Sequence, residues 1–208
     1  MKKILLTILC LLLLAGCTRV DNLSYDGVIK QVLYQDNKHT NERQIGYSFY
    51  KPQGFVSLKR DDYNHIFTYK GHKIYMHVDL YSYNKKAKIK HKLAKDIYYA
   101  KELDDYNKKG FVEIKEEKDA YFYRILYNYI RVEGYADKND MKRVFIKISQ
   151  MLSSFQFNDK VIAKIISENA RDFEERELEY FKDERSLKYG EEKDSSYADI
   201  KKRDEYLY

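Results

Sequence analysis

The chain has 208 residues, which is enough for one folded domain with an extension. Its 22 Tyr and 10 Phe stand against one Pro and 8 Gly, which excludes a collagen-like chain and a disordered Pro/Gly-rich chain. The formal net charge is +6, and both cysteines, Cys10 and Cys17, lie near the N-terminus, so the remaining chain can form no disulfide and no cysteine-based zinc site.

The first 17 residues have the order of an export signal. Lys2 and Lys3 precede an apolar run from Ile4 to Gly16. As a helix this run would measure roughly 20 Å, which is short of the roughly 30 Å hydrocarbon core of a bilayer. The proportions therefore favour the apolar segment of a secretory signal over a spanning helix.

The end of that run, Leu14-Ala15-Gly16-Cys17, resembles the lipobox of bacterial lipoproteins. In that family the Cys sulfur receives a diacylglycerol group, and a peptidase then cuts before the Cys. The resemblance implies that residues 1–16 are lost and that Cys17 holds the protein on the extracytoplasmic face of the cell membrane by two acyl chains, the number that stable anchoring takes. The alternative is an ordinary secretory signal whose cleavage site contains a Cys.

A tether over residues 17–27 and a folded domain over residues 28–158 are expected to follow. Strands are predicted at 28–34, 45–50, 55–58 and 65–69, with a turn at Pro52 and Gly54. Residues 72–83 form the clearest strand, which directs one set of side chains to the core (Ile74, Met76, Val78, Leu80) and a polar-aromatic set to the other face (Tyr75, His77, Asp79, Tyr81, Tyr83).

The hydrophobic period then changes. Spacings near four predict an amphipathic helix over 86–104, followed by a strand from Phe111 and two strands within 120–135, with Gly134 at a bulge or turn. Asp137 or Asn139 is expected to cap a helix over 141–155, for which a strand is the competing prediction. A charged helical extension is predicted over 159–188, and residues 189–208, which show no period, are expected to be mobile.

This order of elements predicts an α+β fold, in which helices cover an antiparallel sheet. Two segments also resemble PsbP-like domains: Pro52-Gln53-Gly54-Phe55 near the start, and Val132-Glu133-Gly134 with the later run Met151 to Phe157 near the end. The resemblance, over about 45–158, implies an α/β/α sandwich that acts by binding and assembly at a membrane surface without catalysis.

Charge is concentrated in one stretch of the basic body. Residues 17–159 carry a net +7 and residues 160–208 a net −3. Five lysines fall close together at the start of the predicted helix and just before it: Lys85, Lys86, Lys88, Lys90 and Lys92. This Lys85–Lys95 face is a candidate surface for anionic lipid or wall polymer, at about 1 kcal/mol per Lys. The alternative is a merely solvated helix face. Export excludes nucleic acid as a partner, and an unknown protein partner is also expected.

Catalytic motifs are not found. The chain has no Gly-rich phosphate loop, no Gly-x-Ser-x-Gly and no His-Glu-x-x-His. His72 and His77 fall on opposite strand faces, whereas His77 and Asp79 share one, where they form either a metal or proton-transfer pair or part of an exposed sheet face. Four tyrosines share strand parity and form either a binding face or part of the core: Tyr121, Tyr123, Tyr127 and Tyr129.

The sequence thus predicts a lipid-anchored, non-catalytic module of the cell envelope that binds or assembles at the outer face of the membrane, without a metal or cofactor. Two alternatives stay open: an envelope hydrolase and a small-ligand-binding lipoprotein.

Overall fold

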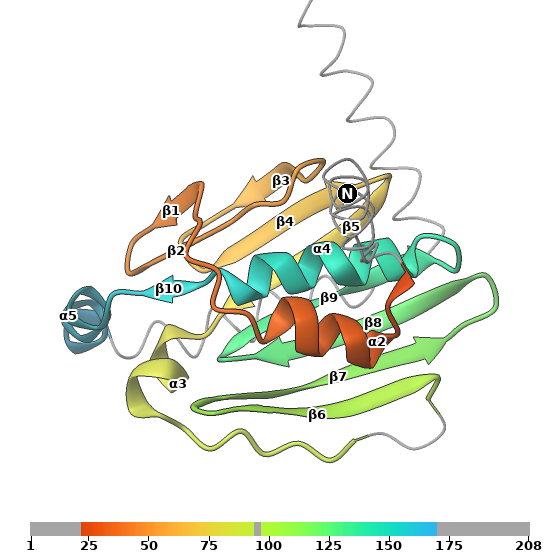
Figure 1. Cartoon of the computed structure of the whole chain (residues 1–208). Coiled ribbons are helices and arrows are strands. Elements are labelled where there is room, and N and C mark those ends of the chain that lie inside the picture. The colour runs from red at the N-terminus through yellow and green to blue at the C-terminus, as the bar shows by residue number, and fades with distance from the viewer. Residues whose placement is uncertain (1–21, 94–96, 170–208) are drawn as a thin grey trace, which may run out of the picture.

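A seven-stranded antiparallel sheet organises the computed structural model, which describes residues 22–93 and 97–169 (Figure 1). Its strands, in spatial order, are β3 (Val56–Arg60), β4 (Asn64–Tyr69), β5 (His72–Val78), β9 (Ile130–Asp137), β8 (Ala120–Tyr127), β7 (Lys108–Glu116) and β6 (Tyr99–Asp105). Every neighbouring pair is antiparallel. The predicted strands at 65–69 and 72–83 and the pair within 120–135 are confirmed, although β5 ends at Val78.

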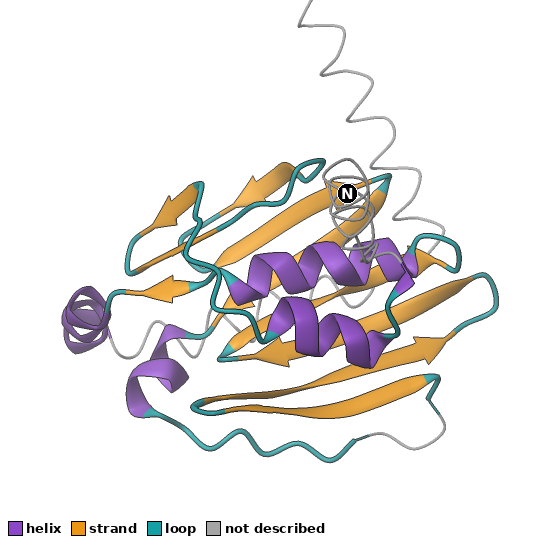
Figure 2. Ribbon diagram, in the orientation of Figure 1, coloured by secondary structure: helices purple, strands orange, loops and turns teal. Residues whose placement is uncertain are grey.

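A second, three-stranded sheet consists of β1 (Glu42–Gln44), β2 (Tyr47–Phe49) and β10 (Gln156–Phe157), with β2 in the middle. The helical segments are α2 (Tyr25–Val28), the π-helical η2 (Ile29–Leu33), α3 (Leu80–Lys85), α4 (Met141–Ser153) and α5 (Asp159–Asn169). Figure 2 shows α4 and the α2–η2 segment side by side over one face of the large sheet. The α+β class with helices on an antiparallel sheet is confirmed.

The core lies between this sheet face and α4. Strand alternation directs Tyr123, Ile125 and Tyr127 of β8 into it, each with at most 1% of its surface exposed. From the other side, α4 contributes a stripe of fully buried residues: Val144, Phe145, Ile148 and Met151. The helix prediction for 141–155 is therefore confirmed over its first thirteen residues, and the competing strand is wrong. The N-cap is Asp140, not Asp137 or Asn139.

The strand predicted at 28–34 is wrong. Ser24 caps a helix instead, since its Oγ accepts a hydrogen bond from the Gly27 N–H at 3.1 Å. Val28, Ile29 and Leu33 are buried on the side of α4, where the Tyr25 ring also meets Phe145 at 5.1 Å. Packing against α4 therefore outweighs the strand preference of the β-branched residues.

The helix predicted over 86–104 is also wrong. Helix α3 ends at Lys85 with the C-cap Lys86, whose φ of +50° is left-handed, and residues from Ala87 to Leu93 form a loop. In this loop the lysines are exposed and the residues between them are mostly half-buried, a period of two that an extended chain produces. Residues 99–105 then become β6 by pairing with β7 at the sheet edge.

Gly134 lies in the middle of β9 and marks neither a bulge nor a turn, because it pairs with Ile74 on one side and Tyr123 on the other. A Cβ at this position would lie 2.5 Å from the Lys73 carbonyl oxygen and 2.7 Å from the Tyr123 hydroxyl. The glycine is therefore required by the close approach of its neighbours.

An aromatic cluster packs the three-stranded sheet against β4. Phe49 and Phe155 stack with ring centroids 4.9 Å apart, and the His65 ring stacks on Phe67 at 5.7 Å. His65 is 1% exposed, and its Nε2 lies 2.7 Å from the Tyr47 hydroxyl. Burial lowers the pKa of His65 to about 4, so this ring is neutral in the folded protein at pH 7.

Candidate anion-binding groove

A groove of about 560 Å³ opens at one end of the large sheet. Three segments that are distant in sequence form its walls: residues 86–89 after α3, the β6–β7 turn with the first two residues of β7 (106–109), and the β8–β9 turn (128–129). Figure 1 shows α3 and the β6–β7 turn at the same end of the sheet. Antiparallel pairing places the β6–β7 and β8–β9 turns at this end of the sheet. The loop that follows α3 lies beside these two turns.

Four lysines line the groove: Lys86, Lys88, Lys108 and Lys109. Lys109 pairs with Asp104 at 2.9 Å, and the Lys86 ammonium lies 3.7 Å from the centre of the Tyr83 ring. Among residues 22–93 and 97–169, no acidic group forms an ion pair within 4.0 Å of Lys86, Lys88 or Lys108. Three ammonium groups around one hollow, none of them held in an ion pair by a described residue, create a positive potential that attracts anions.

The backbone around the groove is strained. The described chain has five non-glycine residues with positive φ, and four of them line this groove: Lys86, Tyr106, Asn128 and Tyr129. Asn128 and Tyr129, with φ of 50° and 66°, turn the β8–β9 hairpin, and a turn with positive φ at both positions normally has Gly second. Such strain costs about 1–3 kcal/mol per residue and gathers at functional sites.

Two tyrosines with positive φ, Tyr106 and Tyr129, shape the groove. Tyr106 is 95% exposed and extends an aromatic ring beside the lysines. Tyr129 fixes the loop, because its hydroxyl donates to the Ala87 carbonyl at 2.9 Å while its own carbonyl accepts from the Asp79 N–H at 2.9 Å. The groove therefore combines cations with aromatic surface, which suits an anionic group on a carbon skeleton.

The predicted lysine cluster is divided by the structure. Lys86 and Lys88 line the groove, whereas Lys85, Lys90 and Lys92 are exposed outside it. Cys17 and Lys95 lie outside the described residues, as does the extension beyond residue 169. Lys108 and Lys109 were missed, although the turn sequence Tyr106-Asn107-Lys108-Lys109-Gly110 between two strands was a signal that could have found them.

His77 and Asp79 form hydrogen bonds that stabilise the fold. His77 is 6% exposed with its Nδ1 2.7 Å from the Asn64 Oδ1, so the expected exposed sheet face is wrong at this position. Burial lowers the pKa of His77 to about 3, which keeps the ring neutral. Asp79 is the N-cap of α3 and accepts from the Ser82 N–H at 2.8 Å. Within 22–93 and 97–169, no three His, Cys, Asp or Glu side chains group as a metal ion requires.

The tyrosines of β8 are mainly core residues. Tyr123 and Tyr127 are fully buried beneath the helices, which confirms the core alternative for both. The Tyr127 hydroxyl donates to Asp105 at 2.8 Å, and Tyr121 is half-buried.

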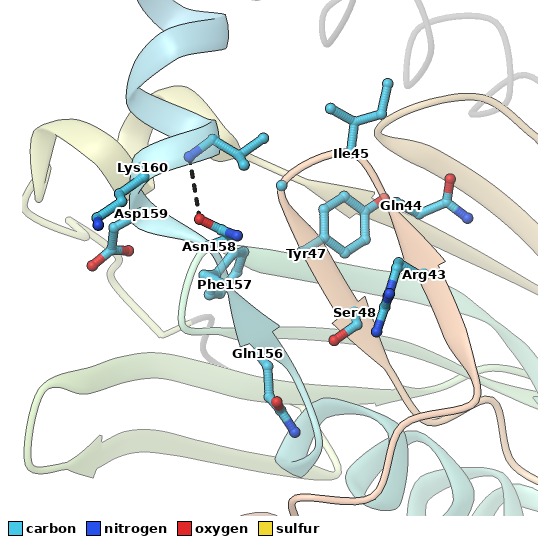
Figure 3. Close-up of a pocket in the computed structure, with 12 residues that line it drawn as sticks. Arg43, Gln44, Ile45, Tyr47, Ser48, Gln156, Phe157, Asn158, Asp159 and Lys160 are labelled. Carbon is cyan, nitrogen blue, oxygen red and sulfur yellow. Dashed lines mark hydrogen bonds between the residues drawn. The ribbon is translucent and has the colours of Figure 1, made fainter.

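A larger hollow of about 760 Å³ lies between the β1–β2 turn and the start of α5 (Figure 3). Its polar groups hold the local structure: the Asn158 side chain accepts from the Val161 N–H at 3.2 Å, and Gln156 donates to the Lys38 carbonyl at 2.8 Å. Lys160 and Asp159 point away from the strand residues in Figure 3. Among the described residues that line this hollow, no nucleophile lies beside a base.

Comparison with known proteins gives no match to a family model and none to a curated protein sequence. In the part of the chain that the structure describes, no helix has both the length and the apolar composition needed to cross a bilayer.

Proposed function

We propose that this protein is a lipid-anchored, non-catalytic module of the cell envelope, held at the outer face of the membrane by Cys17, and that the groove binds phosphate groups of an anionic envelope component. The observation that carries the proposal is the set of three lysines around one strained hollow, none of which forms an ion pair with a residue that the structure describes. Lipid headgroups and wall polymers share the phosphodiester chemistry that ammonium groups attract.

The position of the groove suits a tethered protein. Seven residues separate Cys17 from the start of α2 at Tyr25, a reach of at most about 25 Å, so the body stays near the lipid surface. The Tyr25 ring packs 5.0 Å from Tyr99 at the start of β6, whereas the groove lies beyond the end of β6 at Asp105. Engaging both the tether and the groove would therefore lay the sheet along the membrane.

The absence of catalysis is proposed because the polar groups nearest to the groove have structural roles. Asp79 caps a helix, and Asp159 accepts from the Tyr83 hydroxyl at 2.8 Å. Tyr106 and Tyr129 offer binding surface with polar tips, which favours recognition. The finer fold, an α/β/α sandwich like that of PsbP-like domains, belongs to the same proposal, as does the helical extension.

Co-sedimentation with vesicles tests the groove. The chain from residue 17 with Cys17→Ser is compared with two triple variants of equal charge: Lys86, Lys88 and Lys108→Gln in the groove, and Lys85, Lys90 and Lys92→Gln outside it. At about 1 kcal/mol per Lys, the groove variant loses roughly 100-fold in partitioning to anionic vesicles at low salt.

The control triple is expected to lose less than a tenth as much. Equal losses from both variants would show that general charge, not the groove, drives binding. A soluble phosphodiester polymer that displaces the protein from vesicles would identify the wall as the source of the phosphate, and failure to displace would identify the lipid headgroup.

A further inference from the structure

The face of the large sheet that points away from α4, called here the outer face, carries buried side chains that are not part of the main core. Phe67 and Ile74 face the core, so Ile66 of β4 and its cross-strand partner Tyr75 of β5 lie on the outer face. Ile66 and Tyr75 are 7% and 5% exposed, and Thr68, the next β4 residue on this face, is 2% exposed. A large side chain on a bare sheet face stays in contact with water, so this burial indicates a cover.

The described helices do not lie over these three residues. Helix α4 and the α2–η2 segment lie on the core face, and α3 and α5 lie together at one end of the sheet (Figure 1, Figure 2). Among the described loops, the one after α3 reaches the outer face at β7, where the His91 ring stacks on Phe111 with centroids 3.5 Å apart. In the strand order, β7 lies three strands from β5 and four from β4.

The cover belongs to the same chain, because the side chains are buried in a single copy. Residues 1–21 lead into Ser24, which caps α2 on the core face, and residues 94–96 are too short to cover two strands. Residues 170–208 follow α5 and supply enough chain to return across the sheet.

The first part of that segment has the pattern of an amphipathic helix. Phe173, Tyr180 and Leu187 recur every seven residues, which places them on one side of a helix, among many Glu, Asp, Lys and Arg residues. As a helix, residues 170–188 would measure about 28 Å. Seven strands at a spacing of about 4.8 Å span about 29 Å, so the helix is long enough to cross the sheet.

Charge does not select the cover. On β3, β4, β5 and β9 the outer face carries three basic side chains and two acidic ones: Lys59, Lys73, Arg131, Glu133 and Asp137. This near balance leaves the burial of apolar surface as the main driving force.

We propose that residues 170–188 form an amphipathic helix whose apolar side covers the outer face over β4 and β5, at Ile66, Thr68 and Tyr75. The outer face is thus an interaction surface for an amphipathic helix, and the chain's own C-terminal segment occupies it. The inference rests on the helical extension proposed above, and on neither the lipid anchor nor the groove.

Thiol labelling of the chain from residue 17 with Cys17→Ser tests this proposal. That chain has no thiol, so Thr68→Cys introduces a single one. The Thr68 Oγ1 is buried and accepts or donates no hydrogen bond among the described residues, so the substitution breaks none. Ser149→Cys is the matched control, because Ser149 of α4 is 1% exposed and its Oγ also has no hydrogen-bond partner in the described chain.

Two triple variants change the C-terminal segment: Phe173, Tyr180 and Leu187→Ser on the proposed apolar side, and Tyr197, Tyr206 and Leu207→Ser beyond the proposed helix. The first triple is expected to speed the labelling of Thr68→Cys at least tenfold and that of Ser149→Cys less than twofold. The second is expected to change neither rate more than twofold.

An unchanged labelling rate at position 68 in the first triple would overturn the proposal. Equal acceleration at positions 68 and 149 would also overturn it, because it would show a general loosening of the fold. A rate at position 68 that falls as the protein concentration rises would identify a second copy as the cover. The measurement contains no lipid, so failure of the anchor or of the groove would leave these rates as predicted.

Discussion

Acid should destabilise this protein through two buried histidines. His65 and His77 are 1% and 6% exposed, and burial lowers their pKa values from 6.5 to about 4 and about 3. Because the unfolded chain takes up protons below pH 6.5 and the folded chain does not, stability is complete above that pH and falls as the pH drops toward 4. At about 1.4 kcal/mol per pH unit, each His costs about 2 kcal/mol between pH 6.5 and 5.

The hydrogen bonds of His65 identify a suitable variant. The Tyr47 hydroxyl donates its one hydrogen to the Asp62 carbonyl at 2.8 Å, so His65 must donate through Nε2 to the Tyr47 oxygen. His65→Phe therefore leaves no donor unsatisfied, and its ring can stack on Phe67 and meet Phe49 edge-to-face, as the His65 ring does.

Urea unfolding at pH 7 and pH 5 measures the effect. The native sequence is expected to lose about 4 kcal/mol of unfolding free energy and His65→Phe about 2 kcal/mol. His39→Gln, in an exposed loop, should lose as much as the native sequence. The reasoning fails if the native protein is equally stable at both pH values, or if His65→Phe keeps the full pH dependence.

Two substitutions separate stability from binding. Gly134→Ala should cost about 2 kcal/mol in thermal unfolding, because its Cβ would lie 2.5 Å from the Lys73 carbonyl; a fully stable variant would show that the strands can shift apart. Tyr106→Asn should raise stability by about 0.5–1 kcal/mol, since Asn tolerates a φ of +53°, while weakening vesicle binding. If Tyr106→Asn binds normally, the exposed ring has no part in the groove.

Much of the fold could be predicted from local patterns. The alternation in 72–78 and the four-turn apolar stripe of α4 are strong because one face of each is fully buried. The predictions failed where a short segment with apolar residues was compatible with both a helix and an extended chain. Residues 28–34 include three β-branched residues, Val28, Ile29 and Val32, but they pack on α4 as a helix. In the loop after α3, apolar residues at spacings near four predicted a helix, whereas the observed burial alternates with a period of two.

The candidate site could be predicted only in part. Lys86 and Lys88 were found because they are close in sequence, but Lys108 and Lys109 reach them only through the pairing of β6 with β7. The positive φ of Tyr106 and Tyr129 could not be predicted from the sequence, because positions with positive φ usually hold Gly or Asn and not Tyr.

The central claim is that one acylated sulfur holds a folded, thiol-free body at the outer face of a membrane. Intact-mass and N-terminal peptide analysis of the membrane fraction tests it most directly. The account predicts a chain that begins at Cys17 with diacylglycerol on its sulfur, and release of the Cys17→Ser chain from the membrane. An unacylated chain that keeps residues 1–16 and stays in the membrane would contradict it.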